Sequence, residues 1–168
     1  MAKKYVLADE SDGRSNIVID ENYAAQGAVD LWINEATPAP LVFRGDPTKG
    51  RTFLHEPPDG GAIFRIVTFP KALNDITPEQ MLDYHKALNS IHIPTLDELK
   101  AAKHPSMHRT DTLNYFILLS GSLWMLSEGK DVLLKPGDCV LQLGGMHGWR
   151  VESDDPAVLA CVLIDADV

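Results

Sequence analysis

The segment from His108 to Arg150 constrains the fold more strongly than any other part of the chain. It contains runs of apolar residues separated by glycines, with His108 before the first run and His147 after a later one. Short strands joined by regular turns are typical of a β-sandwich or β-barrel. A small barrel can place both imidazoles in one interior cavity, which predicts a buried site for a small molecule.

The pattern of short strands is present on both sides of His108. Upstream, the apolar runs 16–20, 28–33 and 62–69 are predicted strands, and residues 11–14 are predicted to form a tight turn. Downstream, almost the whole chain is predicted to be β-structure. The strand candidates there are 113–119, 122–127, 131–134, 139–143, 148–152 and 158–164.

Two short helices are expected between these groups of strands. A threonine followed three positions later by Gln or Glu is the pattern of a capping box, and it occurs at Thr77 and at Thr95. Apolar residues then recur at helical spacing. The sequence therefore predicts helices around 77–90 and 95–103 that flank the barrel.

Size and charge narrow the class of protein. The 168 residues are expected to form one domain, with N-terminal strands at 1–70, a helical segment at 77–103 and core motifs at 108–164. The chain carries 15 Lys and Arg against 24 Asp and Glu, a formal net charge of −9. Nucleic acid and anionic membranes require a basic surface, so neither is an expected partner.

The expected location is cytoplasmic. The N-terminus lacks the apolar core of a signal peptide, and no apolar run approaches the roughly 18 residues of a membrane span. Cys139 and Cys161 lie in apolar runs without a Cys-x-x-Cys spacing. We expect both thiols to be buried as small apolar groups rather than joined in a disulfide.

Two short motifs resemble those of the cupins, which are small β-barrels of the jelly-roll (double-stranded β-helix) type. The first is His-Arg-Thr-Asp-Thr at 108–112, and the second is His-Gly-Trp-Arg at 147–150. The start of the chain, 5–15, also resembles one group of small bacterial and fungal cupins. The resemblance implies an all-β cupin barrel, a small-molecule substrate and a homodimer.

The cupin motifs imply four metal ligands, and this chain keeps only two of them. His108 falls on the first motif histidine and His147 on the last, whereas Thr110 replaces a histidine and Asn114 replaces the carboxylate. Gly121 and Gly144 match the motif glycines, and Gln142 stands at the motif proline.

The two replacements weaken the expected metal site. Divalent transition metals are held by imidazole, thiolate and carboxylate groups, usually three or more together. Threonine and asparagine are neutral, and the nearest carboxylate, Asp111, is expected on the other face of the strand. The cofactor is thus either absent or one divalent ion (iron, zinc, manganese or nickel) on His108 and His147.

Strand alternation identifies the residues that face the cavity. The expected catalytic pair is His108 and His147, because imidazole titrates near neutral pH and can transfer a proton. The other histidines, His55, His85, His92 and His104, are expected at the surface. The expected substrate-binding residues are Thr110, Asn114, Phe116, Gln142 and Trp149.

Three functions remain open from the sequence. The first is a lyase or isomerase that acts by decarboxylation, dehydration or proton transfer on a small aromatic or carbonyl-bearing metabolite. The second is a metal-dependent oxygenase, and the third is a non-catalytic module that binds a small ligand. The first is the preferred hypothesis, with His108 and His147 as the acid–base pair.

Overall fold

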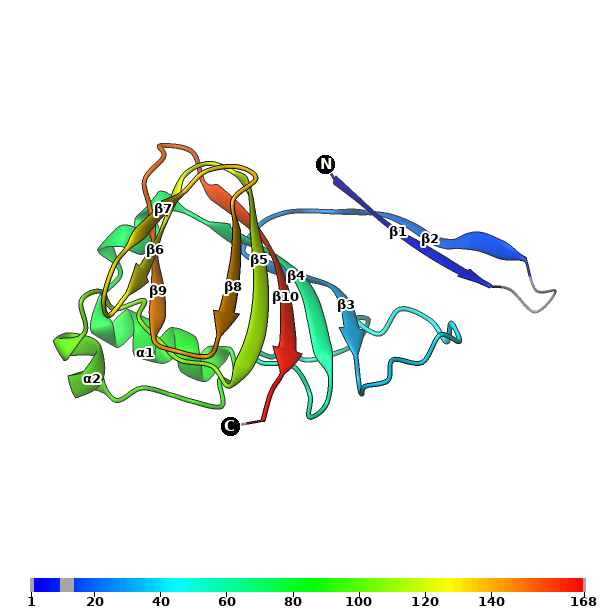
Figure 1. The fold of residues 1–168 in the computed structure, drawn as a ribbon, viewed down its shortest axis with the longest axis horizontal. Coiled ribbons are helices and arrows are strands. Elements are labelled where there is room, and N and C mark those ends of the chain that lie inside the picture. Colours follow the sequence, from blue (N-terminus) through cyan, green and yellow to red (C-terminus); the bar gives the residue numbers. More distant parts are fainter. Residues whose placement is uncertain (1, 10–13, 168) are drawn as a thin grey trace.

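The computed structural model describes residues 2–9 and 14–167 (Figure 1). The predicted turn at 11–14 falls mostly outside these residues. Most of the regular structure is β-strand, and the predicted all-β class with flanking helices is confirmed. Within the described chain no helix is both long enough and apolar enough to cross a membrane.

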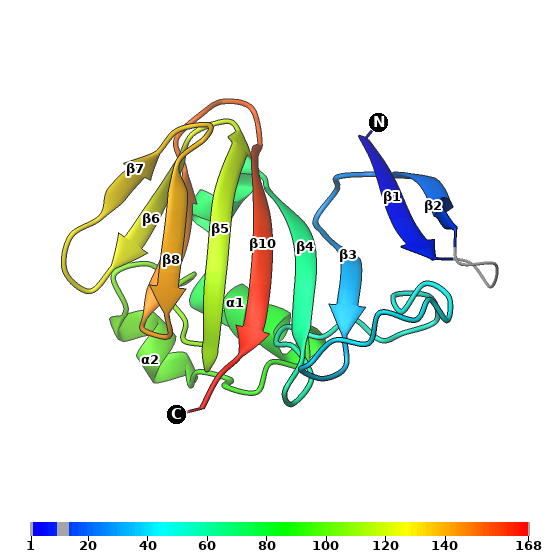
Figure 2. The same cartoon turned by 45° about the vertical axis from the view of Figure 1, so that its right-hand side comes forward.

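A five-stranded antiparallel sheet forms one wall of the barrel (Figure 2). Its outer and inner positions alternate along the strands, so that in β5 Asn114, Phe116 and Leu118 are buried while Tyr115, Ile117 and Leu119 are exposed. In spatial order the strands are β3 (Ala28–Asn34), β4 (Ala62–Phe69), β10 (Ala157–Asp165), β5 (Thr112–Ser120) and β8 (Cys139–Leu143).

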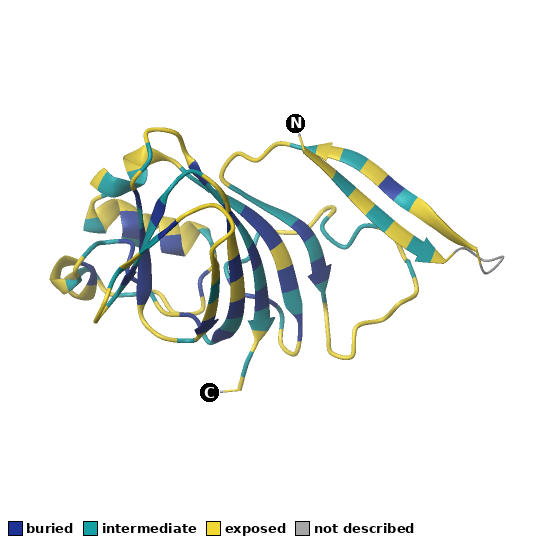
Figure 3. Ribbon diagram, turned by 45° about the horizontal axis from the view of Figure 1, so that its top comes forward, coloured by how far each residue is buried: buried dark blue, intermediate teal, exposed yellow. Residues whose placement is uncertain are grey.

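A three-stranded sheet forms the opposite wall. Its strands, in spatial order, are β7 (Val132–Leu134), β6 (Leu123–Ser127) and β9 (His147–Val151). Apolar side chains from both sheets pack between the walls, among them Ile63, Leu118 and Leu159 from the first sheet and Leu123 and Val151 from the second. Figure 3 shows this alternation as bands of buried and exposed residues along the strands.

The helices lie against one side of the barrel (Figures 1 and 2). They comprise the short 3-10 helix η1 (Lys71–Asp75), α1 (Pro78–Ala87) and α2 (Leu96–Ala101). Both predicted capping boxes are present, with Thr77 bonded to Gln80 and Thr95 bonded to Glu98. Each helix ends earlier than predicted: Asn89 adopts a left-handed φ of 52° after α1, and Ala102 is extended after α2.

The remaining strands form a hairpin that extends away from the barrel (Figures 1 and 2). Strand β1 (Ala2–Asp9) pairs with β2 (Ser15–Tyr23), and Tyr5 and Leu7 are exposed on one face. A salt bridge between the well-buried side chains of Lys4 and Asp46 ties the hairpin to the long loop between β3 and β4.

Only one of the two cysteines is buried, although both were expected to be. Cys161 is buried in β10, as expected, but Cys139 is exposed. Cys139 lies in β8, which is an edge strand of the five-stranded sheet, and its side chain shares the outer face with Leu141 and Leu143. The apolar run at 139–143 was therefore correctly predicted as a strand, but its alternation places the thiol outside.

Candidate functional site

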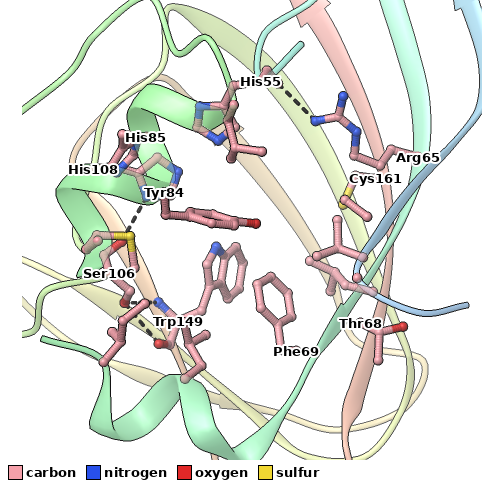
Figure 4. A pocket seen from close by; sticks show the side chains of 18 of the residues that line it. His55, Arg65, Thr68, Phe69, Tyr84, His85, Ser106, His108, Trp149 and Cys161 are labelled. Atoms are coloured by element: carbon pink, nitrogen blue, oxygen red, sulfur yellow. Dashed lines mark hydrogen bonds between the residues drawn. The ribbon is translucent and has the colours of Figure 1, made fainter. Parts of the chain in front are cut away.

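A cavity of about 590 Å³ lies inside the barrel, and α1 contributes part of its wall (Figure 4). Most of the lining is apolar or aromatic, as is usual for a site that encloses a small organic molecule. The aromatic walls are formed by Phe53, Phe69, Tyr84, Phe116 and Trp149. The polar lining includes His55, Arg65, His85, His108, Thr110, Asn114 and His147.

His108 and His147 meet in this cavity. Their backbones form an isolated bridge, with N···O distances of 2.7 and 2.9 Å, and their ring centroids are 4.3 Å apart. Gly148 permits the approach, because a Cβ atom there would lie 2.8 Å from Ser106 Oγ and 3.0 Å from the Met107 backbone nitrogen. The structure thus brings together the two histidines that the motifs singled out.

Hydrogen bonds at Nδ1 determine what each ring presents at Nε2. Nδ1 of His108 lies 2.9 Å from the Ser106 carbonyl, so it carries the proton and Nε2 keeps its lone pair. Nδ1 of His147 lies 2.6 Å from the amide nitrogen of Gln142, which can only donate. Nδ1 is also 3.1 Å from the Gly145 carbonyl, and the shorter amide contact favours the tautomer in which Nδ1 accepts and Nε2 carries the proton.

Both rings are neutral at pH 7. Burial lowers the pKa of His108 well below its usual value of 6.5, and the neighbouring imidazoles of His147 and His55 lower it further. Burial likewise lowers the pKa of His147 to about 4. The pair therefore offers one neutral acceptor nitrogen beside one neutral N–H donor.

Three of the predicted substrate-binding groups are bonded to neighbouring protein groups. Thr110 Oγ1 bonds to Thr112 Oγ1 at 2.8 Å, and the amide nitrogen of Asn114 donates to Gln142 at 2.9 Å. Thr110 and Asn114 line the cavity, together with Phe116 and Trp149, but Gln142 is not among the lining residues. Gln142 instead sits behind His147 and orients its ring.

Two histidines that were expected at the surface are in fact part of the site. His85 is only 2% exposed and His55 is largely buried, and both line the cavity. Their ring centroids lie 5.5 and 5.2 Å from that of His108. The surface assignment is therefore wrong for His55 and His85.

The sequence held a usable signal for one of these histidines. His85 lies four residues after the buried Met81 in α1, so it shares the inward face of that helix. No local pattern identifies His55, which lies in the long loop before β4. Of the other two histidines expected at the surface, His92 is exposed, whereas His104 is partly buried and bonded to Ser106.

The motif positions do not fit a divalent metal ion. Thr110 and Asn114 supply neutral oxygen atoms next to the two histidines, and Asp111 faces outward and pairs with His92. In the part of the chain that the structure describes, no group of three or more His, Cys, Asp or Glu side chains is arranged to hold a metal. A buried dication would lack the negative charge that offsets its desolvation.

Sequence comparison finds curated relatives with modest similarity. The chain is 29% identical over 116 residues to a cupin-domain-containing oxidoreductase of Neurospora crassa, covering 63% of this chain and 59% of that protein. It is 26% identical over 127 residues to the phomopsin biosynthesis cluster protein C′ of Diaporthe leptostromiformis, covering 73% and 51%. The chain thus spans between half and three fifths of these relatives. No protein-family model matches it.

Two cupins are among the solved structures that match the chain. The cupin domain of Schizosaccharomyces pombe Cnp3 has a TM-score of 0.47 and 7% identity, covering 98% of this chain and 88% of that chain. A cupin protein from Bacteroides fragilis has a TM-score of 0.37 and 18% identity, covering 62% and 66%.

The paired antiparallel sheets around a lined cavity define a jelly-roll barrel of the cupin type. This fold agrees with the cupin barrel expected from the motifs, and 63% of the chain is similar to a cupin-domain-containing protein.

Proposed function

We propose that this cupin is an enzyme of the lyase or isomerase type that moves a proton on a small aromatic or carbonyl-bearing metabolite. The observation that carries the proposal is the His108–His147 pair, whose rings are 4.3 Å apart and whose Nε2 atoms have opposite roles. A base and a donor held side by side in a largely apolar cavity are the groups that enolisation of a carbonyl compound requires.

In the proposed step, Nε2 of His108 removes a proton from the carbon next to the carbonyl group. The C–H electron pair forms a C=C bond, and the carbonyl oxygen takes the negative charge. The Nε2–H of His147 donates a hydrogen bond to that oxygen, as a neutral imidazole can do in a buried site. His108 then returns its proton, either to another carbon of an isomerised product or to a departing group in dehydration.

The other predicted site residues orient the substrate in this proposal. Phe116 and Trp149 pack against its apolar part, and Trp149 contacts both Phe116 and His147 edge to face. Asn114 offers Oδ1, which is buried without a hydrogen-bond partner among the described residues. Gln142 holds Asn114 and His147 in position through its own hydrogen bonds, and Thr110 faces the cavity with its hydroxyl bonded to Thr112.

Hydrogen–deuterium exchange tests this function directly. A panel of aryl ketones and 2-keto acids in D₂O is followed by proton NMR for loss of the signal next to the carbonyl. We expect catalysed exchange with the natural chain and a decrease of about 100-fold or more for His147→Ala and His108→Ala, the usual size of an acid–base contribution. Exchange at the natural rate in both variants contradicts the acid–base roles.

Oxidoreductase chemistry is a second candidate, which the name of the Neurospora crassa relative favours. In this alternative a divalent ion on His108 and His147 would take part, although the donors present are a poor fit. Elemental analysis of protein purified without chelator separates the two proposals. About one equivalent of metal per chain, with activity lost on chelation, supports the alternative.

Ligand binding without turnover supports the third hypothesis, a non-catalytic module.

We also propose that the chain forms a homodimer through the outer face of the five-stranded sheet. Tyr115 pairs with Leu141 on one side and with Val162 on the other, and Val162 pairs with Phe64, so that these residues form a row across four strands. Contiguous apolar surface of this kind is typical of an interaction site. The exposed apolar residues of this face are Phe64, Tyr115, Ile117, Leu119, Leu141 and Leu143.

A further inference from the structure

We infer that His85 is a further ligand-binding residue, held by Ser90, His55 and Glu56, and that its Nε2–H selects substrates with a neutral carbonyl oxygen on an aromatic body. The inference rests on the proposed function in one respect, namely that the ligand occupies the cavity beside His108 and His147. His85 adds a second hydrogen-bond donor to the site, and its surroundings favour neutral substrates over anionic ones.

The argument begins at Glu56, whose side chain is buried. Its Oε2 accepts a hydrogen bond from the Ile91 backbone N–H at 3.1 Å, and its Oε1 lies 3.2 Å from Nδ1 of His55. Burial raises the pKa of this carboxyl group, but His55 and the Ile91 N–H outweigh burial and hold the pKa below its usual value. The carboxylate is thus ionised, and Nδ1 of His55 must carry a proton because a lone pair there would be repelled.

Ser90 transmits this constraint to His85. Its Oγ lies 3.0 Å from Nδ1 of His55 and 3.1 Å from Nδ1 of His85. Since His55 already presents an N–H, the serine oxygen accepts from that side, and its single proton is donated to His85. Nδ1 of His85 is therefore an acceptor, and the proton of the neutral ring lies on Nε2.

Nε2 of His85 is buried and has no hydrogen-bond partner among the described residues. An N–H left in this state is costly, by about 1–3 kcal/mol, so an acceptor oxygen from a ligand would be stabilising there. The ring lines the cavity next to His108, and burial lowers the pKa of His85 to about 4, which keeps it neutral. The rings of His85 and His147, each with an N–H to offer, thus both lie next to that of His108.

The charges around the cavity favour a ligand that presents a neutral carbonyl group to His85 over one that presents a carboxylate. Arg65 is the only Lys or Arg among the described lining residues, and its guanidinium is paired with Asp30 and bonded to the carbonyls of His55 and Leu54. An anionic ligand would therefore enter a cavity with no free cation, and the ionised Glu56 lies just behind the wall. A buried unpaired charge is much more costly than a neutral carbonyl group with two donors.

Three probes of nearly equal size test the ligand class on the whole chain: acetophenone, benzoate and ethylbenzene. Saturation-transfer NMR titrations measure the dissociation constant of each. We expect acetophenone to bind more tightly than either of the others, because only it is both neutral and an acceptor. Benzoate binding as tightly as acetophenone, or no saturable binding of acetophenone, overturns the assignment.

Two variants test His85 itself. His85→Leu removes the donor from an apolar helix face, and we expect it to weaken acetophenone binding about 5- to 10-fold while ethylbenzene binding stays unchanged. His85→Gln, whose amide nitrogen can occupy the place of Nε2, is expected to restore most of the affinity. An equal loss for acetophenone and ethylbenzene in His85→Leu would show a packing role only and overturn the inference.

Nitrogen-15 NMR of the imidazoles provides a readout that is independent of affinity and of folding defects in the variants. We expect His85 to show a protonated Nε2 that shifts on addition of acetophenone, and His55 to show a protonated Nδ1. A protonated Nδ1 on His85 contradicts the relay, which is the chain of contacts from Glu56 through His55 and Ser90 to His85. Deuterium exchange into the methyl group of acetophenone is measured in the same samples: binding through His85 without exchange counts against the proposed enzyme function alone, whereas exchange that is unaffected in His85→Leu counts against the role of His85 alone.

Discussion

The position of the proton on a site histidine depends on the side chain that contacts its Nδ1. Gln142 and Ser90 do not act on the substrate in our proposals, yet each favours one tautomer of a histidine through a contact to Nδ1, of 2.6 and 3.1 Å respectively. A change at either position would remove the contact that favours this tautomer of the ring. In this site hydrogen-bond direction is as informative as the identity of the residues.

The buried histidines also predict how stability depends on pH. The pKa of His147 is about 4 in the folded chain against about 6.5 in the unfolded chain, so below pH 6.5 the unfolded state binds more protons. The contribution of the neutral His147 to the free energy of unfolding is fully present above pH 6.5 and is lost as the pH falls towards 4. This contribution is on the order of 3 kcal/mol. Urea denaturation at pH 7.0 and 4.5 measures this loss.

Comparison with variants isolates the contribution of His147. We expect His147→Leu to lose less stability between pH 7.0 and 4.5 than the natural chain. The control, His92→Leu, changes an exposed histidine and is expected to follow the natural chain. Identical pH dependence in all three proteins would show that His147 is not shifted by burial.

Among the elements, η1 and α1 connect the barrel to its cover. The side chain of Asn74 in η1 accepts a hydrogen bond from the Val151 N–H at 2.7 Å and donates one to the Val151 carbonyl at 2.8 Å. These bonds extend the edge of strand β9, which carries His147 and Trp149. The helical segment therefore supplies cavity wall and also satisfies the backbone of a strand that forms the site.

Replacing Asn74 tests this connection. Asn74→Ala leaves both backbone groups of Val151 without their partner, and we expect a loss of about 1–3 kcal/mol in the free energy of unfolding. Chemical denaturation measures the loss, and Asn22→Ala, at an exposed position of β2, is the control. A loss no larger than that of the control would mean that water replaces Asn74 without cost.

The elements were more predictable from the sequence than the site. Strand alternation and the capping boxes at Thr77 and Thr95 act locally, so they are visible in a short window of sequence. The relay from Glu56 through His55 to Ser90 joins residues about 35 positions apart, and only the packing of α1 against the β3–β4 loop brings them together. No periodicity encodes such a contact, which is why His55 was misplaced.

For the whole molecule, the proposed dimer predicts a change in mass in solution. Light scattering after gel filtration should give about twice the chain mass of 18.5 kDa for the natural protein. Leu141→Glu combined with Leu143→Glu places two charges on the outer face, and we expect this variant to be monomeric because buried unpaired charges are costly. Both side chains are exposed in the single chain, so its fold should be unaffected.

The exposed hairpin offers a matched control for this test. Tyr5→Glu introduces a charge at an exposed position of β1, which belongs to a separate two-stranded sheet, and we expect it to leave the mass unchanged. A natural protein with the mass of one chain contradicts the proposed dimer. Dissociation by Tyr5→Glu but not by the leucine changes would instead locate the contact on the hairpin.

The cavity takes its histidines from two sources: His147 comes from β9 and His108 from the segment that bridges to it, whereas His55 and His85 come from a loop and a helix. Grafting only the barrel strands and the His108 segment onto another scaffold would transfer two of the four histidines and none of the hydrogen bonds behind His85. Ligand preference in such chimaeras should follow whichever parent contributes residues 53–92.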